Sequence, residues 1–184
     1  AENCHYSLML KDGKDSMDCL LVEKNERCYE NIAADSSYQA FFSEEIEECR
    51  NVYFSRDMTA CTDCFGCVSL RHKQYHIFNE PYSKEDYEKK LKEFRLDSWR
   101  ELEKMKERVA AFWLRFPRKF MHASHSVDVS GDYIYFSKNA RDCYLVDEVE
   151  DSRWVQLTLF DGAKRSYDYM SGGWNSEYTY EHIS

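Results

Sequence analysis

The chain has 184 residues, which is the size of one ordinary folded domain. Charged residues make up 32% of it and hydrophobic residues 43%, a balance that excludes a collagen-like or disordered chain. The net charge of −9 argues against nucleic-acid binding by the body of the domain, because contact with phosphates needs clustered Lys and Arg. Aromatic residues reach 16%, more than a plain core requires, so we expect them to have a structural role.

No stretch of the sequence approaches the ~20 apolar residues of a membrane-spanning helix, so we expect no membrane span. The first residues lack the basic and apolar regions of a secretory signal, which favours a cytoplasmic location. The sequence begins without Met and ends on an aromatic, strand-like run. We therefore expect a segment of a longer protein, whose partners are other domains of that chain or a second protein.

The first predicted block, residues 1–82, contains short strand-like runs separated by polar residues. Asp18-Cys19 and Asp63-Cys64 each open such a run, and an aromatic residue, Tyr29 or Tyr75, follows the cysteine ten or eleven positions later. Other runs in this block have the same character: Cys28–Ile32, Tyr38–Phe42, Asn51–Asp57 and Tyr75–Phe78. The block is therefore predicted to be β-structure with a repeating unit.

The next segment, residues 83–120, has a helical period. Ser83 is followed three residues later by Asp86, which is typical of a helix N-cap, and Ser98 with Glu101 has the pattern of a second capping box. Pro117 is expected to end the second helix. The apolar residues of the two helices form one stripe each, namely Tyr87, Leu91 and Phe94, then Leu102, Met105, Val109, Phe112 and Phe116. We expect these apolar stripes to be buried, either against the β-structure or against a partner protein.

The last block, residues 121–184, repeats the first. Tyr133–Asn139 resembles Asn51–Asp57, and Asp142-Cys143 with Trp154 matches the aspartate, cysteine and aromatic pattern. Like residues at like places stack on one another when repeats are in register, which favours a coiled stack over a sandwich. The predicted fold is mainly β, a β-solenoid-like repeat stack with an inserted helical hairpin, and the last block continues the same domain.

Residues 1–95 carry a resemblance to a known family. The residues that carry it are Cys49–Ser55, Cys61–Asn79 and Tyr82–Tyr87, with Glu2–Ser7 and Arg27–Glu30 upstream. This region resembles an uncharacterised bacterial repeat family rich in cysteine and aromatic residues, whose larger members carry an N-terminal zinc-ribbon-like segment. The resemblance implies no established activity. Some members carry a CoA-transferase label, which nothing in these residues supports.

Eight cysteines raise three alternatives: reduced core thiols, metal ligands and disulfides. Cys61, Cys64 and Cys67, spaced by two residues, are the sharpest cluster and could hold zinc or an iron–sulfur cluster with His72 or Cys49 as the fourth ligand. The competing interpretation is that the three thiols line successive inward turns of the stack. We favour this second interpretation and expect no cofactor.

Other polar residues suggest weaker hypotheses. A stacked row of Asp18, Asp63 and Asp142 could serve a carbohydrate-active enzyme, although aspartate is also common at turns. His122 and His125 are expected to point to opposite faces of a strand. Residues 83–120 carry a net charge of +4, so this segment is the one that could meet a polyanion, through Arg100, Lys104, Arg108 and Arg115.

No phosphate loop, nucleophile elbow or zinc-protease motif identifies a reaction, so an enzyme is not the favoured interpretation. The sequence favours a binding or scaffolding repeat domain of a larger protein, with an unknown ligand. Three alternatives stay open: a structural metal site, a carbohydrate-active β-helix enzyme and a polyanion-binding helical segment.

Overall fold

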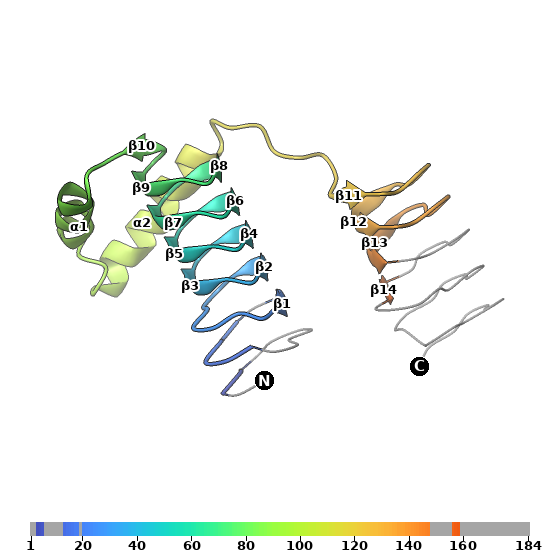
Figure 1. Cartoon of the computed structure of the whole chain (residues 1–184), viewed down its shortest axis with the longest axis horizontal. Coiled ribbons are helices and arrows are strands. Elements are labelled where there is room, and N and C mark those ends of the chain that lie inside the picture. The colour runs from blue at the N-terminus through green and yellow to red at the C-terminus, as the bar shows by residue number, and fades with distance from the viewer. Residues whose placement is uncertain (1–2, 6–12, 19, 148–155, 159–184) are drawn as a thin grey trace. The chain divides into compact units, whose positions relative to one another are not determined.

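The computed structural model describes residues 3–5, 13–18, 20–147 and 156–158. The chain divides into two compact units, residues 1–117 and 118–184. Each unit contains coiled β-structure, and the helices belong to the first (Figure 1). The continuation of one domain through both β blocks stays a prediction.

The first unit is built from short parallel strands in two sheets. One sheet has the order β1-β2-β4-β6-β8, and the other has the order β10-β9-β7-β5-β3, in which only the β10–β9 pair is antiparallel. The strands are β1 (Leu20–Glu23), β2 (Ile32–Asp35), β3 (Tyr38–Phe41), β4 (Glu44–Glu47), β5 (Arg50–Tyr53), β6 (Arg56–Thr59), β7 (Thr62–Phe65), β8 (Val68–Arg71), β9 (Gln74–Ile77) and β10 (Glu80–Pro81).

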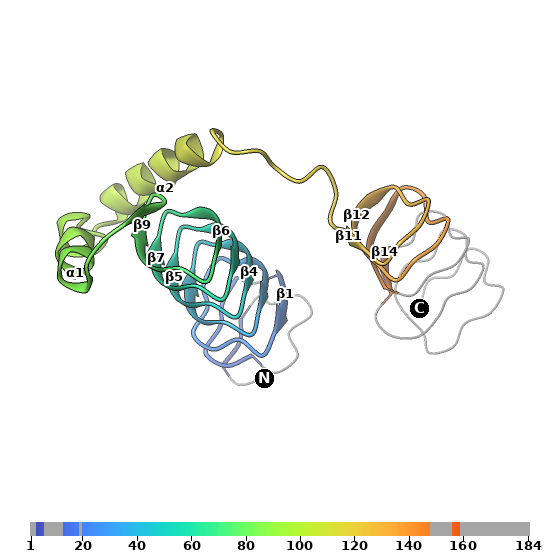
Figure 2. The same cartoon turned by 45° about the horizontal axis from the view of Figure 1, so that its top comes forward.

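The strand register shows a coil of twelve residues. Ile32 lies opposite Glu44, Glu44 opposite Arg56, and Arg56 opposite Val68. Each coil places one strand in each sheet, so a strand recurs every six residues, and the coils stack one behind the other (Figure 2). The predicted β-solenoid-like stack is confirmed, and its repeat is twelve residues, not the ten or eleven that separate each Asp-Cys cysteine from its aromatic residue.

Within each coil, the backbone conformation repeats every three residues. From Ala33 to Phe78, every third residue has a positive φ, and Gly66 is the one glycine among them. The residue that follows each of these positions from Ala34 to Cys67 is buried inside the stack. The left-handed residue therefore turns the chain so that the next side chain points inward.

The interior has two kinds of position that alternate every three residues. Apolar side chains fill the middle of the strands, in a column such as Cys28, Ala40, Val52 and Cys64. Small polar residues fill the bends between the strands and bond to the adjacent coil. Ser55 Oγ, for example, accepts the N–H of Cys67 at 3.0 Å. These side chains satisfy buried backbone groups and hold neighbouring coils in register.

The last coil of the first stack changes character. The polar His76 lies where the preceding coil has Cys64. The amide of Asn79 closes the edge of β8, because its Oδ1 accepts the Val68 N–H at 2.8 Å and its Nδ2 donates to the Val68 carbonyl at 3.0 Å. Polar closure of this kind blunts a sheet edge that would otherwise pair with further strands.

Helix α1 (Lys84–Glu93) begins where the sequence predicts. Ser83 Oγ accepts the Asp86 N–H at 3.1 Å and donates to Asp86 Oδ2 at 2.9 Å. The face formed by Tyr87, Leu91 and Phe94 is packed, which confirms the predicted stripe.

Helix α2 (Trp99–Trp113) departs from two expectations. Ser98 is its N-cap residue but makes no side-chain cap bond, and Glu101 pairs with Lys104 at 2.6 Å instead of completing a capping box. The helix also ends four residues before Pro117, so the proline does not terminate it. No helix in the described residues is long and apolar enough to cross a membrane.

The helices pack on part of the outer face of the stack. Three side chains of the stack, Phe54, Phe65 and Ile77, form one buried cluster with Tyr87, Met105 and Val109 of the helices. Leu102 packs at the margin of the cluster, while Phe112 and Phe116 are half-buried and contact each other with their rings tilted by 57°. The predicted stripe on α2 is therefore buried against the stack at its centre and half-buried at its end.

The second unit contains four strands in its described part, in the order β11 (Ala123–Ser124), β12 (Gly131–Tyr135), β13 (Cys143–Asp147) and β14 (Gln156–Thr158). Ile134 is buried like Val52, and Phe136 has a positive φ like Phe54, which confirms that the two segments are equivalent. Cys64 and Cys143 are both buried but occupy different places. Cys64 is third in β7, whereas Cys143 begins β13 opposite Gly131, and Cys19 and Trp154 lie outside the described residues.

Candidate ligand-binding cavity

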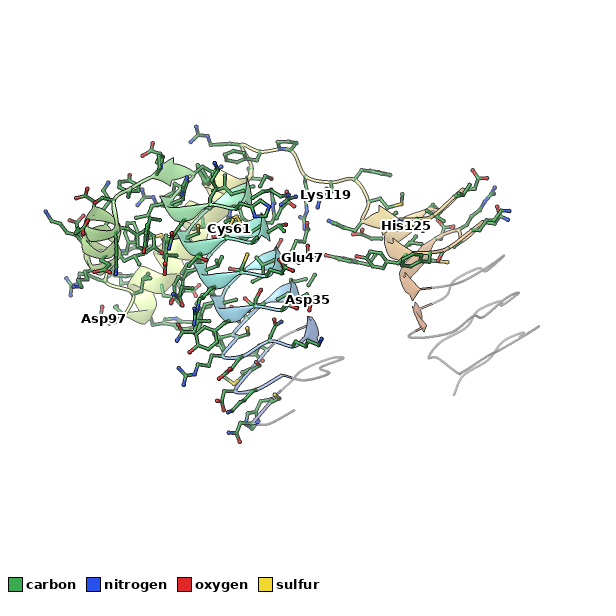
Figure 3. The ribbon with its side chains drawn as sticks, viewed as in Figure 1. Asp35, Glu47, Cys61, Asp97, Lys119 and His125 are labelled. Carbon is green, nitrogen blue, oxygen red and sulfur yellow. The ribbon has the colours of Figure 1, made fainter. Side chains whose placement is uncertain are left out.

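Cys61, Cys64 and Cys67 all lie inside the first stack, as the core interpretation predicts. Each is completely buried, because a spacing of three residues returns each of these three side chains to the interior. Figure 3 labels Cys61 among the coils of the first stack. Their thiols donate to backbone carbonyls, for example Cys67 Sγ to the Phe65 carbonyl at 3.4 Å and to the His76 carbonyl at 3.4 Å.

The proposed fourth ligands behave differently from each other. Cys49 is buried one coil from Cys61, and its thiol donates to the Glu47 carbonyl at 3.2 Å, whereas His72 is exposed on the outside of the stack. Hydrogen bonding to Cys61 and burial raise the pKa values of the Cys49 and Cys64 thiols, which favours their protonated form. In the described part of the chain no group of three or more His, Cys, Asp or Glu side chains could hold a metal ion.

The predicted row of aspartates does not form. Asp18 and Asp63 are 45 positions apart, which is not a multiple of the twelve-residue coil, so they lie in different columns. Asp63 Oδ1 instead accepts from Asn51 Nδ2 at 2.8 Å, and Asp142, in the second unit, bonds to Ser130. The carboxylate row that motivated a carbohydrate-active enzyme is therefore absent from these residues.

The two histidines do not point to opposite faces. His122 stacks on Tyr133, and His125 stacks on Phe136, with ring centroids 4.7 and 4.8 Å apart. The reason is the period of three, which gives residues i and i+3 the same kind of position in a coil. His122 Nδ1 also contacts Asp132 Oδ1 at 2.8 Å.

Two of the four predicted polyanion contacts meet in one cavity. Arg108 and Arg115 line it, whereas Lys104 is paired with Glu101 and Arg100 lies elsewhere on α2. The cavity has a volume of about 730 Å³, within the range of small-molecule sites. It is formed by the end of the first stack and both helices, and its lining comprises Ile77, Phe78, Asn79, Glu80, Tyr82, Lys90, Glu93, Phe94, Arg108, Ala111, Phe112, Arg115 and Phe116.

The cationic groups of the cavity lie over aromatic rings. The guanidinium of Arg108 is 4.7 Å from the ring centroid of Phe78, and that of Arg115 is 5.6 Å from the ring centroid of Phe112. Lys90 Nζ lies 4.7 Å from the ring of Tyr82 and donates to its hydroxyl at 3.3 Å. Within the described residues neither arginine forms an ion pair, although Glu80 and Glu93 line the same cavity.

A single glycine shapes the aromatic wall. Phe42, Phe54, Gly66 and Phe78 occupy one column, at intervals of twelve residues. A Cβ at Gly66 would approach the ring of Phe78 to 2.9 Å, so glycine leaves the space into which this ring packs. The interruption of the column thus brings Phe78 to the cavity, where it contacts Phe112 edge-on at 5.1 Å.

The end of α2 is anchored to the stack by a buried arginine. Arg56 is only 7% exposed, lies 5.3 Å from the ring of Trp113 and donates to the Trp113 carbonyl at 3.4 Å. This contact fixes the helix turn that precedes Arg115 and Phe116. The sequence shows the basic residues of α2 but not Lys90, Tyr82 or Phe78, which come from other elements.

Comparisons of the chain with family models, curated proteins and solved structures found no match.

Proposed function

We propose that this domain is a binding module of a longer protein and that its ligand is a small organic anion with a planar apolar part. The observation that carries the proposal is the pair Arg108 and Arg115, which line one cavity without a carboxylate partner in the described residues. Guanidinium groups bind carboxylates and phosphates through two parallel hydrogen bonds. An anionic ligand could therefore pair with both arginines, with which neither Glu80 nor Glu93 forms an ion pair.

The aromatic wall supports the apolar part of this ligand. Phe78, Phe94, Phe112 and Phe116 all line the cavity, and the two arginines already lie against two of these rings. A ring that enters the cavity could stack on a phenylalanine or on a guanidinium plane. The volume of about 730 Å³ favours a compact ligand over an extended polyanion.

The proposal is tested with 1-naphthyl phosphate, with the uncharged 1-naphthol as the reference ligand, by isothermal titration calorimetry. We expect the phosphate to bind and the variants Arg108→Gln and Arg115→Gln each to weaken it about tenfold or more, because each removes a charge-assisted hydrogen-bond donor. The matched controls Arg100→Gln and Lys104→Gln lie on the same helix outside the cavity and should bind like the parent.

Two results would contradict the proposal. If 1-naphthol binds as tightly as 1-naphthyl phosphate, the arginines do not select an anion. If the two control variants weaken binding as much as the cavity variants, the ligand is held by the general charge of the helical segment, as the polyanion alternative requires.

A further inference from the structure

A second groove lies on the other side of α2 from the cavity. Its volume is about 360 Å³, and its lining comprises Asp18, Glu30, Ile32, Phe42, Glu44, Phe54, Lys106, Val109, Ala110 and Trp113. Helix α2 contributes the last four of these residues and the stack contributes the others. No lining residue is shared with the cavity that contains Arg108.

The stack side of the groove follows the coil. Asp18, Glu30, Phe42 and Phe54 are successive members of one column, twelve residues apart, and Ile32 and Glu44 belong to the next. Coils are separated by about 4.8 Å, so the four members span roughly 14 Å. This length matches about four residues of an extended chain.

The groove is acidic and partly apolar. Three carboxylates line it against one ammonium group, which is the opposite of the charge balance in the cavity with Arg108 and Arg115. Ile32 is 41% exposed beside this charge, and Val109 and Trp113 form the opposite apolar wall.

The chain itself shows how a cation binds in this groove. Lys106 Nζ lies 2.9 Å from Glu30 Oε2 and 4.6 Å from the ring centroid of Phe42, so its ammonium group meets a carboxylate and an aromatic face together. Burial lowers the pKa of Lys106, but the hydrogen bond and attraction of Glu30 outweigh it and raise the pKa. Asp18 continues the same column one coil beyond Glu30 and is exposed.

We infer that this groove docks a basic, extended segment of a partner protein, in which Lys or Arg residues alternate with aliphatic residues. A basic side chain would meet Asp18, and the aliphatic side chains would cover Ile32 beside Trp113. The charge complementarity and the length of the column carry this inference, which is independent of the anion site.

The test measures the binding of two fluorescein-labelled peptides, one of alternating lysine and leucine and one of alternating lysine and serine, by fluorescence anisotropy at physiological salt. The lysine–leucine peptide should bind more tightly, because the groove has an apolar wall as well as charge. We expect Ala110→Trp to weaken it about tenfold or more by filling the groove, and Asp18→Asn to weaken it about threefold, as removal of one exposed charge does.

Matched variants serve as controls. Ala111→Trp places the same bulk on the neighbouring residue, which lines the other cavity, and Asp35→Asn removes an exposed carboxylate outside the groove. Both should bind the peptide like the parent. Three results would each overturn the inference. Asp18→Asn and Asp35→Asn could weaken peptide binding equally, or Ala110→Trp could bind the peptide like the parent. The parent could also bind the lysine–serine peptide as tightly as the lysine–leucine peptide.

A further outcome concerns a second copy of this chain. If the parent self-associates and Ala110→Trp abolishes that association, the occupant is another copy and the proposed partner is wrong. Loss of anion binding in Arg108→Gln with retained peptide binding would leave the inference intact and separate it from the proposed function.

Discussion

Fifteen residues other than glycine hold a positive φ between Ala33 and Phe78, a conformation that costs about 1–2 kcal/mol for a residue with a side chain. The stack offsets this cost with hydrogen bonds. Phe42, Phe54 and Phe78, for example, each donate a backbone N–H to the preceding coil at 2.9 Å. The left-handed residue directs its backbone N–H along the stack, so each strained residue makes a hydrogen bond that joins two coils.

One half-buried carboxylate in the second unit is held by several hydrogen bonds. Asp132 Oδ1 accepts the His122 N–H at 2.6 Å and the Tyr133 N–H at 3.0 Å, and contacts His122 Nδ1. Burial alone raises the pKa of Asp132, but these hydrogen bonds and the attraction of His122 outweigh it, so the pKa lies below its usual value.

This lowered pKa predicts a loss of stability in acid. A carboxylate whose pKa is lower in the folded than in the unfolded state stabilises the fold above the unfolded value of about 3.9, and this contribution disappears as the pH falls through the folded value. We expect Asp132→Asn to melt below the parent at about pH 5, and the difference in Tm to narrow toward pH 2.5. A difference that is constant with pH, or that matches the exposed control Asp128→Asn, would contradict this account.

At the scale of elements, the helices pack on one part of the outer face and leave the rest less covered. Phe41, Tyr53, Phe65 and Ile77 are successive members of one column. Phe65 is completely buried and stacks on Phe94 with ring centroids 4.8 Å apart, whereas Phe41 is half-buried and stacks only on Tyr53 among the described rings. Phe65 and Phe41 therefore occupy equivalent positions, but the helices pack only on Phe65.

This difference predicts unequal effects of the same substitution. Phe65→Ala should lower the free energy of unfolding by about 3–5 kcal/mol, because it opens a cavity under the helices. Phe41→Ala should cost clearly less, about 1–2 kcal/mol, since solvent already reaches that ring. Urea denaturation of both variants measures these values. Equal losses would show that the helices do not form part of the core of this unit.

The sequence predicts helices well where neighbouring residues alone determine the structure. Ser83 with Asp86 gives the start of α1, and the spacing of Met105 and Val109 gives the buried face of α2. Ser98 with Glu101 fails as a capping box, because Glu101 pairs with Lys104 at 2.6 Å instead.

The sequence also carries a signal of the twelve-residue coil, but this signal is harder to recognise than the helix caps. Ser37, Ser43, Cys49, Ser55, Cys61 and Cys67 mark every sixth residue, yet six of the ten left-handed positions between them carry glutamine, glutamate, phenylalanine or alanine. Local propensity for φ > 0 favours glycine, asparagine and aspartate, so only Asn51, Asp57, Asp63 and Gly66 give a signal. Hydrogen bonds between coils, which are not local, impose the conformation.

At the scale of the whole molecule, the candidate site could be predicted only in part. The net charge of +4 in residues 83–120 points to α2, and Arg108 and Arg115 are on that helix. The cavity also needs Phe78 from the end of the stack and Lys90 from α1, which no sequence spacing relates to α2. The proposed sites thus arise from packing: one helix against the flank and end of a stack, with opposite charge on its two sides.

The most direct test of this arrangement uses Ala110→Trp and Ala111→Trp, adjacent exposed residues on α2 that line the acidic groove and the basic cavity, respectively. Each variant is titrated with 1-naphthyl phosphate and with the lysine–leucine peptide, after circular dichroism confirms parental folding. We predict that Ala111→Trp loses the phosphate and keeps the peptide, whereas Ala110→Trp loses the peptide and keeps the phosphate. Folded variants that lose both ligands together, or neither, would contradict the account of two separate sites on one helix.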